Sequence, residues 1–223
     1  MRSHNPYSVG IVLSWCQELI AKQGAGSFED KLKNADRETA NLFSSINILQ
    51  EQLYLADIIA NPDAITYGQK HYSQLYGFIY KMVKLFEPRA AKRGISISLR
   101  GSSVSEVLTY NSFQFVPLIL LDNAVKYSYR NKEIVISINE NDKKVILTVN
   151  SFGNLVPIES REKIFDKYER GTNGTTENPH GMGLGLYLAS LIAKAHGTEI
   201  CYECSPDNGE VGSNEFSIVM DIV

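Results

Sequence analysis

The order of apolar and polar residues divides the chain into a helical first part and a mixed second part. Residues 6–23 carry apolar residues at helical spacing, and Asn5 followed by Pro6 is typical of a helix start. A second helical pattern runs from about residue 28 to 60. The short link between them predicts an antiparallel hairpin whose thin core favours pairing with a second copy, the alternative being that it packs on its own C-terminal domain. The apolar seam of the second helix consists of Leu42, Ile46, Leu49, Leu53 and Ala56.

The second part alternates short strand patterns with helical patterns. An Asn-Asp turn joins two of the strand patterns into a hairpin, and the whole predicts a mixed, largely antiparallel sheet with helices on one face. The fold class is therefore α+β, an N-terminal helical hairpin followed by an α/β sandwich. Strands are expected at 95–99, 133–138, 144–149, 199–204 and 216–222. Helices are expected at about 72–86, 112–128, 160–167 and 184–196.

Composition narrows the classes of partner. The 22 Lys and Arg residues nearly balance 25 Asp and Glu residues, and without a basic run a nucleic-acid partner is not expected. The longest apolar run, 116–121, is far below the ~20 residues of a membrane span, and no signal-peptide pattern is seen. We therefore expect a cytoplasmic protein with no membrane contact within this sequence.

Three cysteines fit a reducing compartment. Cys201 and Cys204 form a CxxC pattern, but they lie in a strand pattern without a second ligand pair, so a structural role is favoured over zinc or redox chemistry. His196 ends a predicted helix, where a cation would suit the helix dipole.

Two stretches carry candidate chemistry. Asp122, Asn123 and Lys126 are spaced to line one polar edge of an otherwise apolar helix, which suits either a ligand or a bond to a neighbouring loop. A loop containing Gly181, Gly183 and Gly185 enters the helix predicted at 184–196. Such a loop exposes backbone N–H groups at the positive helix end and suits an anion, although a plain glycine turn has the same pattern.

Four segments resemble, in order and spacing, the asparagine, first glycine, phenylalanine and second glycine boxes of sensor histidine kinases. That family shares its Bergerat-type ATP-binding fold with gyrase, Hsp90 and MutL proteins. The resemblance covers about residues 72–223, while the hairpin is similar to the dimerisation and phosphotransfer domain. It implies two domains, residues 1–66 and 67–223. The segments are LILLDNAVKYS, VNSFGNLVP, REKIFDKYERG and HGMGLGLYLASLIAKAHG.

The resemblance implies ATP and Mg²⁺ as cofactors and assigns a role to each matching residue. Asn123 would bind Mg²⁺, Lys126 would contact phosphate and Tyr127 would line the nucleotide pocket. Phe165 would pack under a mobile lid that begins at Arg170 and spans 171–180. The second glycine box would receive the phosphates through Gly181, Gly183, Leu184, Gly185 and Leu186.

The first glycine box departs from the family. Aligned on Gly153 and Pro157, it has Ser151 where the family has the Asp that reads the adenine amino group, and Leu155 replaces a glycine. A serine hydroxyl accepts a hydrogen bond without the charge that strengthens it. Asn150 is an alternative adenine contact. From Ser151 we expect weak ATP binding with poor discrimination against GTP.

The phosphoacceptor is also atypical. His4 is followed by Asn5, and Ser8 comes four positions later, as an acidic residue and a Thr or Asn do in the family. A disordered terminal histidine is the alternative. The function implied is ATP-dependent autophosphorylation on a histidine within a homodimer, then transfer to an aspartate of a response-regulator receiver domain. The rival hypotheses are a catalytically degenerate dimeric scaffold or binding module, and an ATP-driven clamp or serine/threonine kinase of the same fold.

Overall fold

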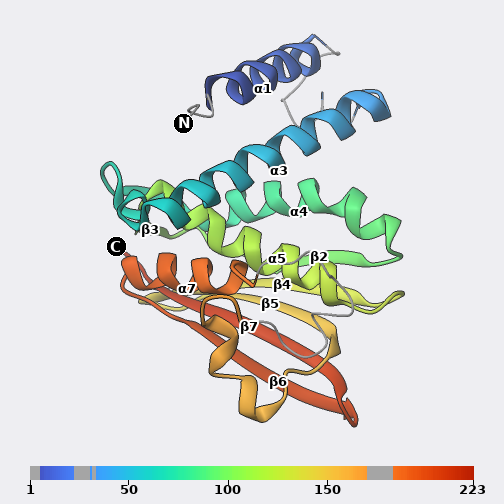
Figure 1. The fold of residues 1–223 in the computed structure, drawn as a ribbon, viewed down its shortest axis with the longest axis vertical. Helices are drawn as coiled ribbons and strands as arrows, with labels where there is room; N and C mark the ends of the chain where they lie inside the picture. The colour runs from blue at the N-terminus through green and yellow to red at the C-terminus, as the bar shows by residue number, and fades with distance from the viewer. Residues whose placement is uncertain (1–5, 23–30, 32–33, 170–182) are drawn as a thin grey trace. The chain divides into compact units, whose positions relative to one another are not determined.

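The computed structural model describes residues 6–22, 31, 34–169 and 183–223, and the chain divides into two compact units, residues 1–62 and 63–223. In the first unit, α1 (Pro6–Ala21) contacts α3 (Arg37–Ala60), and the two run in opposite directions (Figure 1). Helix α3 begins at Arg37, inside the pattern predicted to run from about residue 28, of which residues 28–30 and 32–33 lie outside the described residues. Asp36 caps it there, because its Oδ1 accepts from the backbone N–H groups of Glu38 and Thr39 at 3.0 and 2.9 Å.

The second unit is built on one sheet. Its five strands have the order β2-β4-β5-β7-β6, in which β2 and β4 are parallel and the other neighbours antiparallel. The predicted mixed, largely antiparallel sheet is confirmed. The strands are β2 (Ser96–Gly101), β4 (Glu133–Glu140), β5 (Lys144–Asn154), β6 (Ile200–Asn208) and β7 (Val211–Asp221).

Helices α4 (Leu75–Lys92), α5 (Phe115–Tyr127) and α7 (Gly185–Ala195) cover one face of this sheet (Figure 1). We call it the helix-covered face and its reverse the opposite face. The single-turn 3-10 helices are η1 (Pro62–Thr66), η2 (Asn111–Gln114), η3 (Ile158–Ser160) and η4 (Lys163–Phe165). Within the described ranges, no helix combines the length and apolarity that a bilayer span requires.

A second, two-stranded sheet was not predicted. Strands β1 (His71–Gln74) and β3 (Glu106–Thr109) pair antiparallel, and β1 takes the start of the segment predicted as a helix from residue 72. Each has four residues, too few for an alternating pattern to stand out. The hairpin between β4 and β5 turns at the predicted Asn-Asp pair, because Asn141 Oδ1 accepts from the backbone N–H groups of Lys143 and Lys144.

The core lies between the helices and the sheet. Along β5 every second residue is buried, as a strand packed on one face requires. Helix α5 is buried on most of its surface, and Leu120 and Leu121 are each 1% exposed. Burying such side chains contributes about 1.5–3 kcal/mol each. The polar residues that remain on α5 therefore mark its one accessible edge.

Candidate functional site

The polar edge predicted on α5 is present. Asp122, Asn123, Lys126 and Tyr127 are all partly exposed, whereas Ala124 and Val125 between them are buried. Asp122 Oδ2 forms an ion pair with Lys126 Nζ one helical turn later. An amide, a carboxylate and an ammonium group thus lie together on a helix otherwise surrounded by the core.

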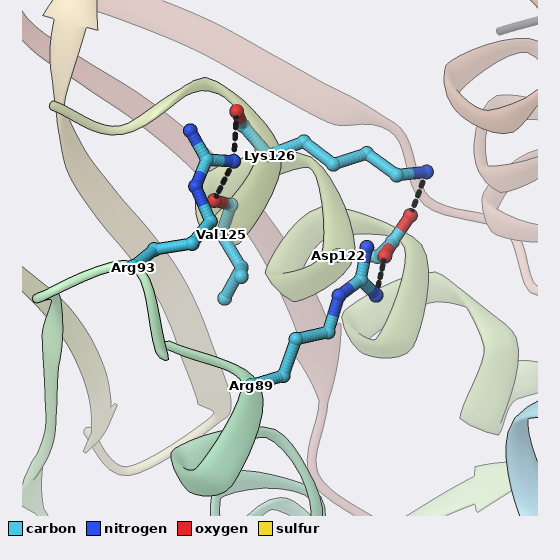
Figure 2. Close-up of polar contacts among 5 residues, drawn as sticks. All are labelled: Arg89, Arg93, Asp122, Val125 and Lys126. Atoms are coloured by element: carbon cyan, nitrogen blue, oxygen red, sulfur yellow. Dashed lines mark hydrogen bonds and ion pairs between the residues drawn. The ribbon is translucent and has the colours of Figure 1, made fainter. Parts of the chain in front are cut away.

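Two arginines, one within α4 and one at its C-terminus, form hydrogen bonds with this edge (Figure 2). Arg89 donates to Asp122 Oδ1 at 2.5 Å, so that carboxylate lies between two cations. Arg93 donates to the backbone carbonyl of Val125 at 2.7 Å and to that of Lys126. A cation bonded to the last carbonyls of a helix stabilises its C-terminus.

The first glycine box lies at the end of β5 and adjoins α5. Gly153 passes so close that a Cβ there would lie 2.4 Å from the carbonyl oxygen of Tyr127. Hydrogen bonds also join the two segments beside this contact. Ser128 Oγ and the N–H of Tyr129 both donate to the carbonyl of Phe152, at 3.2 and 2.8 Å. Glycine is thus required by the contact between the first glycine box and the asparagine box.

The pleat of β5 separates Ser151 from Asn150. Ser151 is 8% exposed on the helix-covered face, in line with Val149 and Gly153. Asn150 points to the opposite face, where its Nδ2 donates to Ser213 Oγ at 2.7 Å and to Glu215 Oε2 at 3.2 Å. Asn150 therefore lies on the reverse side of the sheet from the polar edge of α5, which argues against it as an adenine contact.

The second glycine box begins α7. Gly183 has φ +66°, and a Cβ there would lie 2.7 Å from the carbonyl oxygen of Glu169. At Gly185 a Cβ would lie 3.3 Å from Ile119 Cγ2, which places the first turn of α7 against α5. Leu184 precedes the helix without a capping side-chain bond, and Leu186 is partly exposed in the first turn. The first-turn N–H groups have no intrahelical partner, so this end of α7 suits an anion.

The phenylalanine box does not form the helix predicted at 160–167. The single turn η3 precedes the box and η4 lies within it; they are closed by bonds from Ser160 N to Pro157 O at 2.9 Å and from Asp166 N to Lys163 O at 2.8 Å. Phe165, at the end of η4, contacts Phe216 of β7 edge to face at 6.4 Å between ring centroids. This side chain thus ties the segment to the helix-covered face of the sheet.

The comparisons with known proteins agree with this geometry. Residues 111–221 match the family described as histidine kinase-, DNA gyrase B- and HSP90-like ATPases, and that range includes α5, β5, η4 and α7. The second unit of the chain therefore contains an ATPase domain of this family. The resemblance to histidine kinases is confirmed, and with it the Bergerat-type fold of the second unit.

Individual relatives point the same way. The signal transduction histidine-protein kinase ArlS of Staphylococcus haemolyticus is 33% identical over 87 residues, which are 39% of this chain and 19% of ArlS. The match thus spans about a fifth of the length of this curated relative. Among solved structures, the catalytic domain of histidine kinase ThkA has a TM-score of 0.58 at 23% identity and covers 70% of this chain and 99% of its own. Acinetobacter baumannii histidine kinase AdeS has a TM-score of 0.56 at 20% identity, covering 100% and 99%. At these identities the structural likeness shows the fold alone.

Some of the predicted site residues lie outside the described residues. These are His4, Arg170, Gly181 and the lid segment 171–180. Cys201 and Cys204 are described, and both are free. Three positions apart on β6, their side chains point to opposite faces, so the two sulfurs cannot converge on one ion. The described part of the chain contains no group of three or more His, Cys, Asp or Glu side chains that could hold a metal.

His196 is neutral and not the helix-end cation we predicted. The backbone N–H of Tyr110 donates to its Nε2 at 3.0 Å, so Nδ1 carries the hydrogen and donates to the Ile192 carbonyl at 2.7 Å. Burial lowers the pKa of His196, and the charge of Lys70 lowers it further. The ring also contacts Tyr110 and Phe113 edge-on, so its position at the C-terminus of α7 serves packing.

Four residues that complete the site's surroundings were missed in the sequence. Arg89 and Arg93 are ordinary helix-end cations in the sequence, and only the packing of α4 on α5 gives them partners. Tyr202 and Asn214 lie on neighbouring strands, and Tyr202 donates to Asn214 Oδ1 at 2.6 Å. Burial raises the pKa of Tyr202 to about 12, so its hydroxyl remains protonated and able to donate.

Proposed function

We propose that this chain is the ATP-binding and phosphotransfer core of a two-component sensor histidine kinase. The observation that carries the proposal is the convergence of the two glycine boxes on the asparagine box in α5. Gly153 of the first glycine box contacts the carbonyl of Tyr127, and Gly185 of the second packs on Ile119. The polar edge of α5 lies between these contacts, and Asn123 and Lys126 project from it.

Asn123 fits the role of a Mg²⁺ ligand. Mg²⁺ prefers oxygen ligands, takes one or two from the protein and keeps waters and substrate phosphates for the rest. The neighbouring Asp122 is already bonded to Arg89 and Lys126, which leaves the Asn123 amide as the oxygen donor we assign to the ion. A bound Mg²⁺ would neutralise charge on the phosphates of ATP.

Lys126 and the start of α7 serve the phosphates in this proposal. The Lys126 ammonium would exchange Asp122 for phosphate. The backbone N–H groups at the start of α7, which lack an intrahelical partner, would add donors at Gly183, Gly185 and the leucines that follow them. In phosphoryl transfer the protein acts mainly through positioning and charge stabilisation. Asn123, Lys126 and the start of α7 would supply both positioning and charge stabilisation.

The first unit would supply the phosphoacceptor histidine and the dimer interface. We propose His4 as the phosphorylated residue and a receiver-domain aspartate as the next acceptor. Support for a homodimer comes from α3, where Leu42 and Leu49 remain 50% and 47% exposed on the predicted apolar seam. Light scattering at a protein concentration of roughly tens of micromolar would give the mass of a dimer if the seam pairs with a second copy.

Two measurements on the full chain test the proposal. Calorimetry with ATP should show binding that strengthens when Mg²⁺ is added. Incubation with γ-labelled ATP should place the label on the protein as an acid-labile, base-stable adduct. The variant His4→Gln should lose the label and keep ATP binding. A wild-type protein that binds no nucleotide would overturn the proposal.

A catalytically degenerate scaffold is the second candidate. It is favoured by one observation, the neutral Ser151 buried where the family carries a carboxylate. The same two measurements separate the candidates, because a scaffold would remain unlabelled under conditions where the kinase is labelled. A label that survives His4→Gln would instead locate the acceptor elsewhere.

A further inference from the structure

A second polar residue lies directly beside Ser151 on the helix-covered face. In the pairing of β5 with β7, Ser151 stands opposite Asn214, and each is 8% exposed. Residues directly opposite in an antiparallel pair have Cβ atoms about 4.5–5.5 Å apart. A ligand group that reaches Ser151 therefore also comes within reach of the Asn214 amide.

The orientation of that amide is determined by its neighbours. Val156 donates its N–H to the Tyr202 hydroxyl at 3.2 Å, so the proton of that hydroxyl is directed to Asn214 Oδ1. On the other side Asn214 Nδ2 donates to the carbonyl oxygen of Asn154 at 3.2 Å, and a carbonyl can only accept. If the amide were turned over, its Nδ2 would face the donating Tyr202 hydroxyl and its Oδ1 would face the Asn154 carbonyl oxygen.

The locked amide keeps spare hydrogen-bonding capacity. Among the described residues, Tyr202 and Asn154 are the partners that the structure gives to the Asn214 side chain. An amide oxygen accepts two hydrogen bonds and an amide nitrogen donates two. One lone pair on Oδ1 and one N–H therefore remain for a ligand, and Oδ1 keeps the role of acceptor.

We propose that Asn214, held in this orientation by Tyr202, makes the site selective for adenine over guanine. The inference rests on the proposed function and names the residue that reads the base. The 6-amino group of adenine donates to Oδ1, whereas guanine presents a carbonyl oxygen at the same position and two acceptors repel. The Ser151 hydroxyl can donate or accept, so by itself it distinguishes neither base. Asn214 therefore gives the site a preference for ATP over GTP that Ser151 alone would not give.

The first test removes the amide. ATP, GTP and purine riboside triphosphate, which lacks the 6-amino group, are titrated with Mg²⁺ into wild type and Asn214→Ala. Wild type should bind ATP about tenfold more tightly than the other two, the ratio that one well-placed hydrogen bond supports. In Asn214→Ala the three affinities should converge. The melting temperature of each protein reports separately on any loss of fold.

The second test releases the lock and keeps the amide. Tyr202→Phe retains the ring that packs against Phe216 at 5.0 Å but removes the hydroxyl, so the Asn214 amide can turn. The ratio of ATP to GTP affinity should fall severalfold. Tyr129→Phe is the matched control, because it removes a hydroxyl bonded to Asn154 Oδ1 and leaves both bonds of Asn214 in place. Its ratio should equal that of wild type.

The outcomes distinguish this inference from the proposed function. Wild type that binds ATP and GTP equally, or variants that lose all three nucleotides by the same factor, would overturn the role of Asn214 and leave the proposed function standing. An equal loss of affinity for all three nucleotides would mean that Asn214 only stabilises the end of β5. Wild type that binds none of the three would overturn both.

Discussion

Asn150 and Ser151 are neighbours on β5 with small polar side chains, yet they face opposite surroundings. Asn150 bonds across to Ser213 and Glu215 of β7 on the opposite face of the sheet. Ser151 is buried beside Asn214 on the helix-covered face. A strand alternates its side chains, so one step along the chain separates a residue with access to the α5 edge from one without it. The proposed nucleotide chemistry belongs to one face only.

The largest expected effect on that face comes from Asn123→Ala. Loss of the proposed Mg²⁺ ligand should lower ATP affinity by at least about a hundredfold, since altering groups that only orient metal ligands already costs about 10–100-fold. Asn123 is partly exposed, so the melting temperature should change little. Asn150→Ala removes an amide from the opposite face and should leave ATP affinity unchanged. Calorimetry that finds equal affinity for wild type and Asn123→Ala would contradict the assignment.

Next in size is Gly153→Ala, which tests the contact between β5 and α5. The added methyl group would lie 2.4 Å from the Tyr127 carbonyl oxygen, so backbone must shift, and unfolding free energy should fall by about 2–3 kcal/mol. Gly77 of α4 has open space around its Cβ position, so Gly77→Ala should be neutral or stabilising by up to about 1 kcal/mol. Urea denaturation measures both. Equal stability of Gly153→Ala and wild type would mean that the two segments approach less closely.

A smaller effect is expected from restoring a carboxylate at the first glycine box. Ser151→Asp should raise ATP affinity about tenfold, the difference of about 1.4 kcal/mol between a charge-assisted and a neutral hydrogen bond. GTP affinity should change little. Asn150→Asp places the same charge on the opposite face and should change neither. If Ser151→Asp leaves ATP binding unchanged or weaker, Ser151 does not occupy the adenine-reading position.

The smallest effect concerns His196, at the C-terminus of α7. Burial lowers its pKa in the folded state below the ordinary 6.5, so the unfolded chain binds more protons. Its contribution to stability is complete above pH 6.5 and is lost as pH falls through 6.5 and then through the lower folded pKa. Protonation would set a new N–H against that of Tyr110, with Lys70 adding repulsion.

The comparison for this prediction is His196→Gln against wild type. Unfolding free energy measured from pH 7.5 downward should fall more steeply in wild type than in the variant, which lacks the titrating ring. His71, exposed on β1, is present in both proteins, so the difference between the two curves belongs to His196. Parallel curves would contradict a neutral, bonded His196.

The sequence by itself determined the elements whose information is local. The polar edge with Asn123 and Lys126 follows from helical spacing, and the glycines before α7 announce a helix start without side chains. The Asn-Asp turn likewise depends on bonds between residues two or three apart. These patterns depend on neighbours within one turn of chain, and they sufficed for the fold class and the family.

Tertiary structure alone decided which distant groups meet. The sequence left Ser151 and Asn150 as alternatives, because strand orientation is set when helices pack on one face. Asn214 acquires meaning only through the register that sets it opposite Ser151, a partner 63 residues away along the chain. Arg89 likewise joins the site when α4 packs on α5. Local spacing carries no information on such contacts, since they arise from the burial of whole faces and not from propensities of single segments.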